Sequence, residues 1–293
     1  MPHTINPYET DPAKIPESDL YADVPQFGRY LPRPDDFVPD PQHINSTTPE
    51  SIDYWLSVLS RCMAEFRIYE NEPGRRDVFA FGSVIVKSAH LKEEPLHDYT
   101  LVDENEAVVL SLAKQALGDI RVPRIYFSGK LNGRNVLVQE RIPGIAMDVA
   151  WHYLGADEKA SFKDQTREVI RKLYTVTPPD TVKGPAYVIP DPDPVAHRGL
   201  MNEEWEMILS KHANDQDPRF THNDITRDNI IVNDGKIVAV IDWEMAGFFS
   251  WDTAREVHLE FRCLKRESYA NANVPEEILD DILAWNDLYS NTP

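Results

Sequence analysis

The alternation of apolar and polar positions divides the chain into a strand-rich first part and a helical second part. Short runs in which apolar residues alternate with polar ones predict strands at residues 66–70, 77–81 and 83–88. Another strand is predicted in RNVLVQERIPG (134–144), which ends in a Pro-Gly break. Apolar residues spaced three and four apart predict helices, most of them after Gly144. The expected helices cover residues 48–63, 104–117, 157–174, 203–211, 253–266 and 275–288.

This order of elements predicts an α+β protein with two lobes and a cleft between them. A small β-rich N-lobe is expected at residues 49–139, and it begins with a helix that Thr48 caps. A larger, mainly helical C-lobe is expected at residues 140–293. Residues 1–48 are rich in proline and show little periodicity, so we expect an N-terminal extension that is disordered or lies extended over the domain.

The stretch FTHNDITRDNIIVNDGKIVAVIDWE (220–244) predicts a β-hairpin with polar residues at its open end. A two-residue turn at Asp234-Gly235 joins two apolar runs. Since side chains alternate along a strand, Asp242 is expected to share a face with Asn229. The expected cross-strand pairs are Val232 with Ile237, Ile231 with Val238, and Asn229 with Val240.

The polar residues at this open end suit phosphoryl transfer. A carboxylate (Asp242) and an amide carbonyl (Asn229) form a ligand set for Mg²⁺, which takes few protein ligands and leaves room for phosphate oxygens. Asp224, in the loop before the hairpin, can orient a hydroxyl and accept its proton as the phosphoryl group transfers. His222 can brace that loop through its ring nitrogens. Taken singly, these are ordinary turn and strand-end residues, but the spacing H-x-D-x-x-x-x-N before a hairpin that ends in Asp is much more specific.

Composition and charge narrow the class of protein. The formal charge of −19 argues against nucleic acid as a partner, because phosphate backbones select basic surfaces. The same charge is compatible with a cationic small substrate, although an acidic surface more often only confers solubility. No apolar run reaches the length of a membrane helix, and the first residues do not read as a signal peptide. Cys62 and Cys263 share no metal or redox spacing, so we expect free thiols and a cytoplasmic location.

The segments HNDITRDN and VIDWE resemble the catalytic and metal-binding segments of the aminoglycoside phosphotransferase family, and more distantly those of choline kinases and protein kinases. The whole hairpin looks most like that of fungal members. The resemblance implies a two-lobed protein kinase-like fold and an enzyme that uses ATP and Mg²⁺ to phosphorylate a hydroxyl of a small molecule. It also implies that Asp224 is the catalytic base, that Asn229 and Asp242 hold Mg²⁺, and that His222 supports the loop.

The N-lobe supplies the residues that would bind ATP. Lys87 ends an apolar strand, and Glu106, preferred over Glu104, lies on the inward stripe of the next helix. A Lys–Glu pair would fix the ammonium group against the α- and β-phosphates. By resemblance to the family's hinge, the backbone C=O of Glu140 and the N–H of Ile142 would meet the adenine. The alternative is that this segment is only a core strand.

The chain departs from the family's pattern at several positions. Asn223 stands where the family usually has Gly, and Asn tolerates turn conformations. Thr226 replaces a lysine of protein kinases, which favours a small-molecule kinase. Gln139 would place a polar group at the back of the nucleotide pocket. The loop expected to cover the phosphates offers NEPGRR in place of a glycine-rich motif. Its Arg75 and Arg76 are candidates for contact with phosphate, but two exposed arginines in a turn are more commonly solvated, and that is the expectation here.

The acceptor is the least determined part of the reaction. Aromatic and acidic residues follow Asp242, and they suit an aminoglycoside- or amino-alcohol-like acceptor. For most of them the preferred interpretation is an amphipathic helix with a solvated acidic face and aromatic residues in the core. Glu244 is the one candidate retained for acceptor binding. The alternative function is a kinase-fold protein without phosphotransfer activity, used as a binding module or for another reaction on a small molecule. The oligomeric state cannot be predicted from the sequence.

Overall fold

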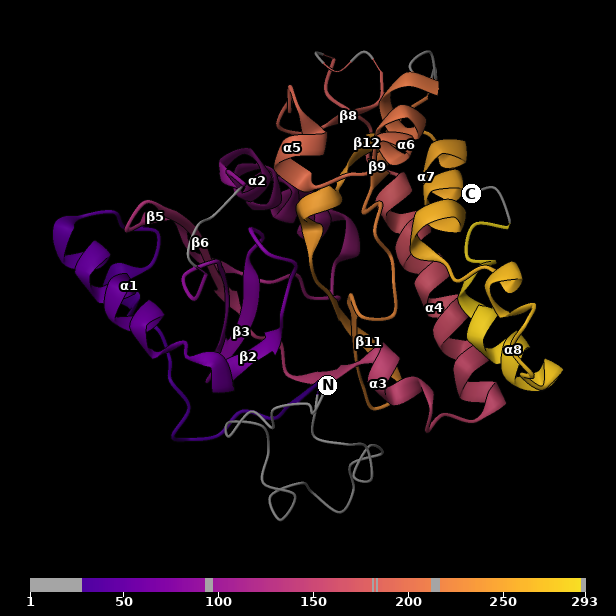
Figure 1. The fold of residues 1–293 in the computed structure, drawn as a ribbon, viewed down its shortest axis with the longest axis horizontal. Coiled ribbons are helices and arrows are strands. Elements are labelled where there is room, and N and C mark those ends of the chain that lie inside the picture. The colour runs from indigo at the N-terminus through magenta and orange to yellow at the C-terminus, as the bar shows by residue number, and fades with distance from the viewer. Residues whose placement is uncertain (1–27, 93–96, 181, 183, 212–216, 291–293) are drawn as a thin grey trace.

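The computed structural model of the chain describes residues 28–92, 97–180, 182, 184–211 and 217–290. These residues form a β-rich lobe and a helical lobe that lie side by side (Figure 1). The α+β class and the two-lobed arrangement predicted from the sequence are therefore confirmed. The predicted extension falls partly at residues 1–27, which lie outside the described residues.

The N-lobe is built on a five-stranded antiparallel sheet. Helix α1 (Pro49–Arg61) packs its apolar face on this sheet, and the hydroxyl of Thr48 accepts the N–H of Ser51 as the predicted cap. Trp55 of α1 stacks near Phe127 of the sheet, and each such buried side chain contributes about 1.5–3 kcal/mol. In spatial order the strands are β2 (Arg67–Tyr69), β3 (Asp77–Phe81), β4 (Val84–Ser88), β6 (Arg134–Glu140) and β5 (Ile125–Leu131).

Helix α2 (Thr100–Leu117) lies between the two lobes. It packs against β5 of the N-lobe, and also against α4 (Ala156–Tyr174) and the 3-10 turn Trp243–Met245 of the C-lobe. Its buried positions recur at helical spacing, as its amphipathic sequence predicts. A helix held from both sides places its side chains where the lobes meet.

The C-lobe combines helices with two small antiparallel sheets. One sheet has the order β1 (Arg29–Tyr30), β7 (Gly144–Ala146), β10 (Ile230–Asn233), β11 (Lys236–Val240), and the other has the order β8 (Ala186–Tyr187), β12 (Gly247–Phe249), β9 (Arg219–Thr221). The remaining α-helices are α3 (Met147–Trp151), α5 (Pro194–Arg198), α6 (Asn202–Trp205), α7 (Trp251–Val257) and α8 (Glu276–Ile282). Single π-helical segments extend α6 over Glu206–Lys211 and α7 over His258–Arg262.

A cluster of aromatic and aliphatic side chains around α4 fixes the base of the hairpin formed by β10 and β11. Phe162 and Val169 of α4 belong to the same buried core as Ile230 of β10 and Val240 of β11. Trp243, which is fully buried, follows the hairpin into this core and donates its indole N–H to the carbonyl of Val240. The apolar residues at the open end of the hairpin are thus packed in the core, and this packing fixes the strand ends that carry the polar residues.

The hairpin register differs from the predicted one. The turn at Asp234-Gly235 and the pairing of Val232 with Ile237 are as predicted. Beyond that pair a β-bulge shifts the register, so Ile231 pairs with Ala239 and Ile230 pairs with Val240. The predicted pairs Ile231–Val238 and Asn229–Val240 are wrong, because the bulge places the extra residue Val238 on β11 and the alternation argument assumes a ladder without one.

Residues 28–48 are bonded to both lobes. Strand β1 pairs with β7, the backbone N–H of Ser83 donates to the carbonyl of Phe37 at 2.9 Å, and the ring of Phe37 lies against Phe81. Gly82, in the turn between β3 and β4, has a φ of +56°, and a Cβ atom added there would lie 2.4 Å from the backbone nitrogen of Phe37. This part of the expected extension is therefore ordered and packed. The predicted lobe boundary, between residues 139 and 140, stays a prediction.

Candidate active site

The loop between β9 and β10 is held in shape by His222. The backbone N–H of Asp224 donates to Nδ1 of His222 at 3.3 Å, so the ring proton is on Nε2, which donates to the carbonyl of Ile241 at 2.9 Å. Burial lowers the pKa of His222 to about 4, so the ring is neutral. Asn223 has a φ of +62°, the left-handed conformation that Asn tolerates in place of Gly. His222 therefore joins the loop to the end of β11.

Asp224 and Asn229 face each other across this loop. The side-chain amide of Asn229 donates to the backbone carbonyl and to Oδ2 of Asp224, both at 2.9 Å. Its own carbonyl oxygen is consequently turned away from Asp224. The backbone N–H of Ile241 donates to the carbonyl of Asn229 at 3.0 Å, so the residue before Asp242 is bonded to Asn229 despite the shifted register. The predicted common face of the Asn229 and Asp242 side chains stays a prediction.

Arg262 contacts the other oxygen of Asp224. Its Nε atom lies 2.7 Å from Oδ1, and its Nη2 atom donates to Glu204 of α6. Burial raises the pKa of Asp224 to about 6, the charge of Arg262 opposes that rise, and the negative charge of Asp242 adds to it. With 23% of its side chain exposed, Asp224 is within reach of a small molecule. An accessible carboxylate with a pKa near neutrality has the properties of a general base.

Lys87 of β4 meets carboxylates from both lobes. Its Nζ atom lies 3.2 Å from Glu106 of α2 and 2.6 Å from Asp242. Burial alone lowers the pKa of Lys87, but the charges of Asp242 and Glu106 outweigh it and leave the pKa above its ordinary value. Glu106 is buried whereas Glu104 is exposed, which agrees with the choice of Glu106 from the helical pattern.

A sequence model of the phosphotransferase enzyme family, APH, matches residues 80–249. The chain belongs to this family. The match spans β3 to β12 and so includes the lysine, the α2 glutamate, the catalytic loop and the hairpin. It confirms the resemblance to aminoglycoside phosphotransferases, while the closer likeness to fungal members stays a prediction.

Solved structures similar to this chain include three phosphotransferases. The streptomycin–ATP ternary complex of APH(2″)-IIa has 14% identity and a TM-score of 0.48, over 83% of this chain and 82% of that one. Aminoglycoside phosphotransferase APH(4)-Ia has 15% identity and a TM-score of 0.46, over 83% and 88%. Macrolide 2′-phosphotransferase MphH from Brachybacterium faecium has 16% identity and a TM-score of 0.39, over 82% and 84%. A comparison with curated proteins finds no match.

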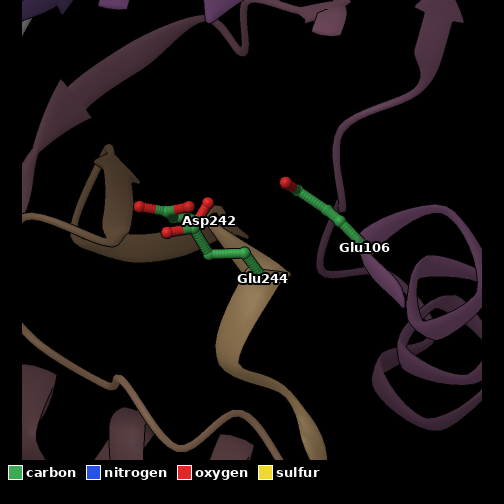
Figure 2. A group of neighbouring side chains, drawn as sticks. All are labelled: Glu106, Asp242 and Glu244. Atoms are coloured by element: carbon green, nitrogen blue, oxygen red, sulfur yellow. The ribbon is translucent and has the colours of Figure 1, made fainter. Parts of the chain in front are cut away.

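Three carboxylates of this APH-family chain gather around the ammonium group of Lys87 and supply oxygen donors of the kind a divalent cation takes. One carboxylate oxygen from each of Glu106, Asp242 and Glu244 lies within 4.8 Å of the others, and Figure 2 shows Glu106 reaching from α2 toward the other two. Oε1 of Glu106 is buried and has no hydrogen-bond partner among the described residues. Asp242 has a φ of +63°, an uncommon conformation that turns the chain sharply at the strand end. Oxygen donors of this kind are those that Mg²⁺ prefers.

Glu244 lies on the lysine side of the site. Its Oε2 atom is 3.6 Å from Nζ of Lys87 and 3.1 Å from Nη2 of Arg76, and these cations lower the pKa of Glu244 against the opposing effect of burial. Its backbone carbonyl accepts hydrogen bonds from Arg198 and Asn105. Contact of Glu244 with an acceptor stays a prediction.

The hinge residues lie where β6 leaves the sheet. The N–H of Arg141 donates to the carbonyl of Ser83, so the carbonyl of Glu140 and the N–H of Ile142, on the opposite side of the extended chain, face away from β4. The Glu140 carboxylate is paired with Arg121 outside the site. Gln139 is buried, as its predicted place at the back of a pocket requires. The adenine contacts of Glu140 and Ile142 stay a prediction.

Two arginines in the site were missed or misjudged from the sequence. Arg76 was expected to be solvated, but it is only 4% exposed and pairs with Asp103 and Glu244, so that prediction is wrong. Arg262 occupies a polar position of a helical pattern, and nothing in that pattern marks it as a partner of Asp224. The sequence held one indication of a second buried cation. Asp103 lies three residues before Glu106, so both carboxylates project from the same face of the helix, and a second carboxylate on the inward face requires a cationic partner such as Arg76.

None of the helices in the described residues combines the length and the apolar composition that a membrane span needs.

Proposed function

We propose that this chain transfers the γ-phosphoryl group of ATP, in the presence of Mg²⁺, to a hydroxyl of a small molecule. The observation that carries the proposal is the meeting of Lys87, Glu106 and Asp242 across the two lobes, at the open end of the hairpin that also holds Asp224. Membership of the phosphotransferase enzyme family supports the same reaction class.

Asp224 would act on the acceptor. The acceptor oxygen attacks the γ-phosphorus, the bond between that phosphorus and the β,γ-bridging oxygen breaks, and ADP leaves with the bond's electrons. The hydroxyl proton passes to the carboxylate of Asp224, whose pKa of about 6 leaves it mainly ionised at neutral pH. Asn229 and Arg262 hold its two oxygens and so fix the direction in which it receives the proton.

Lys87 and the hairpin end would bind the nucleotide. Asn229 and Asp242 would hold Mg²⁺, which when bound offsets charge on the β- and γ-phosphates. Lys87 would then release Asp242 and contact phosphate while Glu106 keeps its ammonium group in place. The backbone of Glu140 and Ile142 would contact the adenine.

An aminoglycoside- or amino-alcohol-like acceptor is the class that we infer. The formal charge of −19 favours a cation over an anion near the protein surface. Glu244 would contribute to this attraction, although its carboxylate is shared with Arg76 and Lys87. Parallel assays with amino alcohols and with neutral polyols of the same size would separate recognition of charge from recognition of the hydroxyl.

The deciding test is the melting temperature with and without MgATP, for the wild type and for Asp242→Ala. A rise of several degrees that requires both Mg²⁺ and Asp242 is expected, because a ligand at one hundred times its Kd adds about 2.7 kcal/mol of stability. A screen of alcohols for ADP release then identifies the acceptor. Stabilisation by MgATP without transfer to any alcohol would favour the binding-module alternative, and no stabilisation at millimolar MgATP would contradict a nucleotide site.

A further inference from the structure

A row of alternating charges crosses from the loop between β2 and β3 into the C-lobe. Nη1 of Arg76 donates to Oδ1 of Asp103 at 2.5 Å, and Nη2 donates to Oε2 of Glu244 at 3.1 Å. The same Oε2 atom of Glu244 lies 3.6 Å from Nζ of Lys87, which is paired with Glu106. Two cations therefore share one carboxylate oxygen, and one of them is the lysine assigned to phosphate.

The order of these charges links Arg76 to the position of α2. Asp103 and Glu106 lie three residues apart on α2, and side chains at this spacing project from the same face of a helix. Arg76 holds the first and Lys87 holds the second. The guanidinium of Arg76 also lies over the ring of Tyr99, 4.3 Å from its centroid, just before the helix begins. The first turns of α2 are thus bound to this one side chain.

We propose that Arg76 is a positioning residue for the nucleotide site: by joining Asp103 to Glu244 it fixes α2 to the C-lobe and so aligns Glu106 with Lys87. This inference rests on the proposed function for its effect on catalysis, but its effect on α2 is independent of any nucleotide.

Charge balance gives Arg76 a second effect on Lys87. The carboxylates of this row form ion pairs with two cations, Arg76 and Lys87. Removal of Arg76 takes one of them away and leaves Glu244 with Lys87 and with Arg198, which donates to its backbone carbonyl. Glu244, no longer held by Arg76, would compete with Glu106 for the ammonium group. Loss of Arg76 would therefore loosen α2 and also redirect Lys87.

The same loop provides a matched control. Arg75 also reaches the C-lobe, where its Nη2 atom donates to the carbonyl of Gly199 at 3.3 Å, but its carboxylate partner is Glu72 of its own loop, at 3.8 Å. Arg75→Met removes a contact between the lobes without changing the row of charges. Asn105 still binds α2 to the C-lobe through the carbonyl of Ala246 in every variant, so we expect Arg76→Met to fold.

The experiment compares wild type, Arg75→Met, Arg76→Met, Arg76→Lys and Asp103→Asn. Amide hydrogen exchange over residues 103–110 is measured without nucleotide, and the KM values for MgATP and for the acceptor are measured separately. Arg76→Met is expected to speed exchange in this segment and to raise the KM for MgATP by roughly tenfold or more, with the acceptor KM unchanged. Arg76→Lys should restore both measurements part of the way to the wild-type values. Lysine keeps the positive charge but lacks the two guanidinium Nη atoms with which Arg76 contacts Asp103 and Glu244.

Two results would overturn the inference. One is exchange in α2 that is the same, within twofold, for Arg76→Met and Arg75→Met. The other is an equal rise in both KM values, which would indicate a general loss of structure. If Arg76→Met does not fold, the same measurements on Asp103→Asn decide the question, because this isosteric substitution removes the ion pair between α2 and Arg76. If the wild type transfers no phosphate, the proposed function fails while the exchange measurement still decides the role of Arg76.

Discussion

The ammonium group of Lys87 lies 2.6 Å from a carboxylate oxygen of Asp242, although 155 residues separate the two in the chain. This ion pair links the N-lobe sheet directly to the residue expected to hold the metal. Lys87 and Asp242 are therefore already charged and paired with each other before a nucleotide binds. Binding would replace this ion pair by contacts to phosphate and metal, and no group would have to become charged in a buried site.

Removing the Asp242 carboxylate is expected to abolish transfer while leaving the fold intact. Asp242→Asn should lower kcat by a factor on the order of a thousand or more, because the groups that offset developing phosphate charge contribute that much. Lys87 keeps Glu106 as a partner, so the melting temperature without nucleotide should change little. The control is Asp234→Asn, an exposed turn position with a φ of +48°, which Asn also tolerates. Normal turnover in Asp242→Asn would refute its assignment.

Arg262 is expected to act on turnover more than on nucleotide binding. Arg262→Met frees Oδ1 of Asp224 and leaves the buried Glu204 without this cation, so kcat should fall by roughly tenfold or more. The KM for MgATP should stay the same, because Arg262 contacts the base and not the lysine side of the site. Arg266→Met, which removes an exposed arginine paired with Glu276, is the control and should match the wild type. An unchanged kcat in Arg262→Met would show that Asp224 does not depend on this contact.

Two buried histidines are expected to make stability fall at mildly acid pH. Burial lowers the pKa of His222 and of His258 to about 4, whereas an unfolded histidine titrates near 6.5. Between these values the unfolded chain binds protons at the two histidines that the folded chain does not, so their contribution to the free energy of unfolding declines as pH falls from about 6.5 toward about 4. Burial raises the pKa of Asp224 to about 6 and that of Glu106 to about 7, so these two carboxylates contribute to the pH dependence with the opposite sign. Above that window the two histidines contribute no pH dependence.

This dependence can be measured by urea unfolding between pH 8 and pH 5. His258→Gln keeps a donor for the carbonyl of Trp285 and removes one titrating group, so its stability relative to the wild type should rise as the pH is lowered. His152→Gln changes an exposed histidine and should follow the wild type. Equal slopes for wild type and His258→Gln would contradict the assignment of a neutral buried ring.

Gly82 is expected to tolerate alanine much less well than Gly235. Both lie in turns between neighbouring strands and have positive φ values, +56° and +69°, so both variants carry backbone strain of order 1 kcal/mol. At Gly82 the added Cβ would meet backbone atoms of Phe37, while at Gly235 it would meet nothing within 4 Å. Gly82→Ala should therefore lower the free energy of unfolding by more than Gly235→Ala, as denaturant titration can show. Equal losses would mean that the contact with Phe37 yields easily.

The sequence was most informative where function is local in the chain. His222, Asp224 and Asn229 lie in one loop, so their spacing could be read against a known chemistry, and the two-residue turn was recognisable from Asp234-Gly235. The helical pattern around Leu110 and Ala113 was enough to choose Glu106 over Glu104, since only one of them could face the core.

What the sequence did not predict depends on contacts between distant segments. The bulge at Val238 has no turn residue or glycine to announce it, and it altered every pairing beyond Val232. Arg76 and Arg262 have ordinary sequence surroundings, and their importance comes from carboxylates that folding alone brings to them. Polar networks of this kind are invisible to periodicity, which reports only which face of an element is buried.

The segment that follows Gly28 has a mechanical consequence. It is bonded through β1 to the C-lobe strand β7 and through Phe37 to the turn that precedes Lys87. Residues 31–36 are thus a tether of fixed contour length between the two lobes, and the cleft cannot open further than this tether reaches unless one of its ends detaches. The separation of the two lobes is in this way limited by a short stretch of chain that lies far in sequence from the residues where the lobes meet.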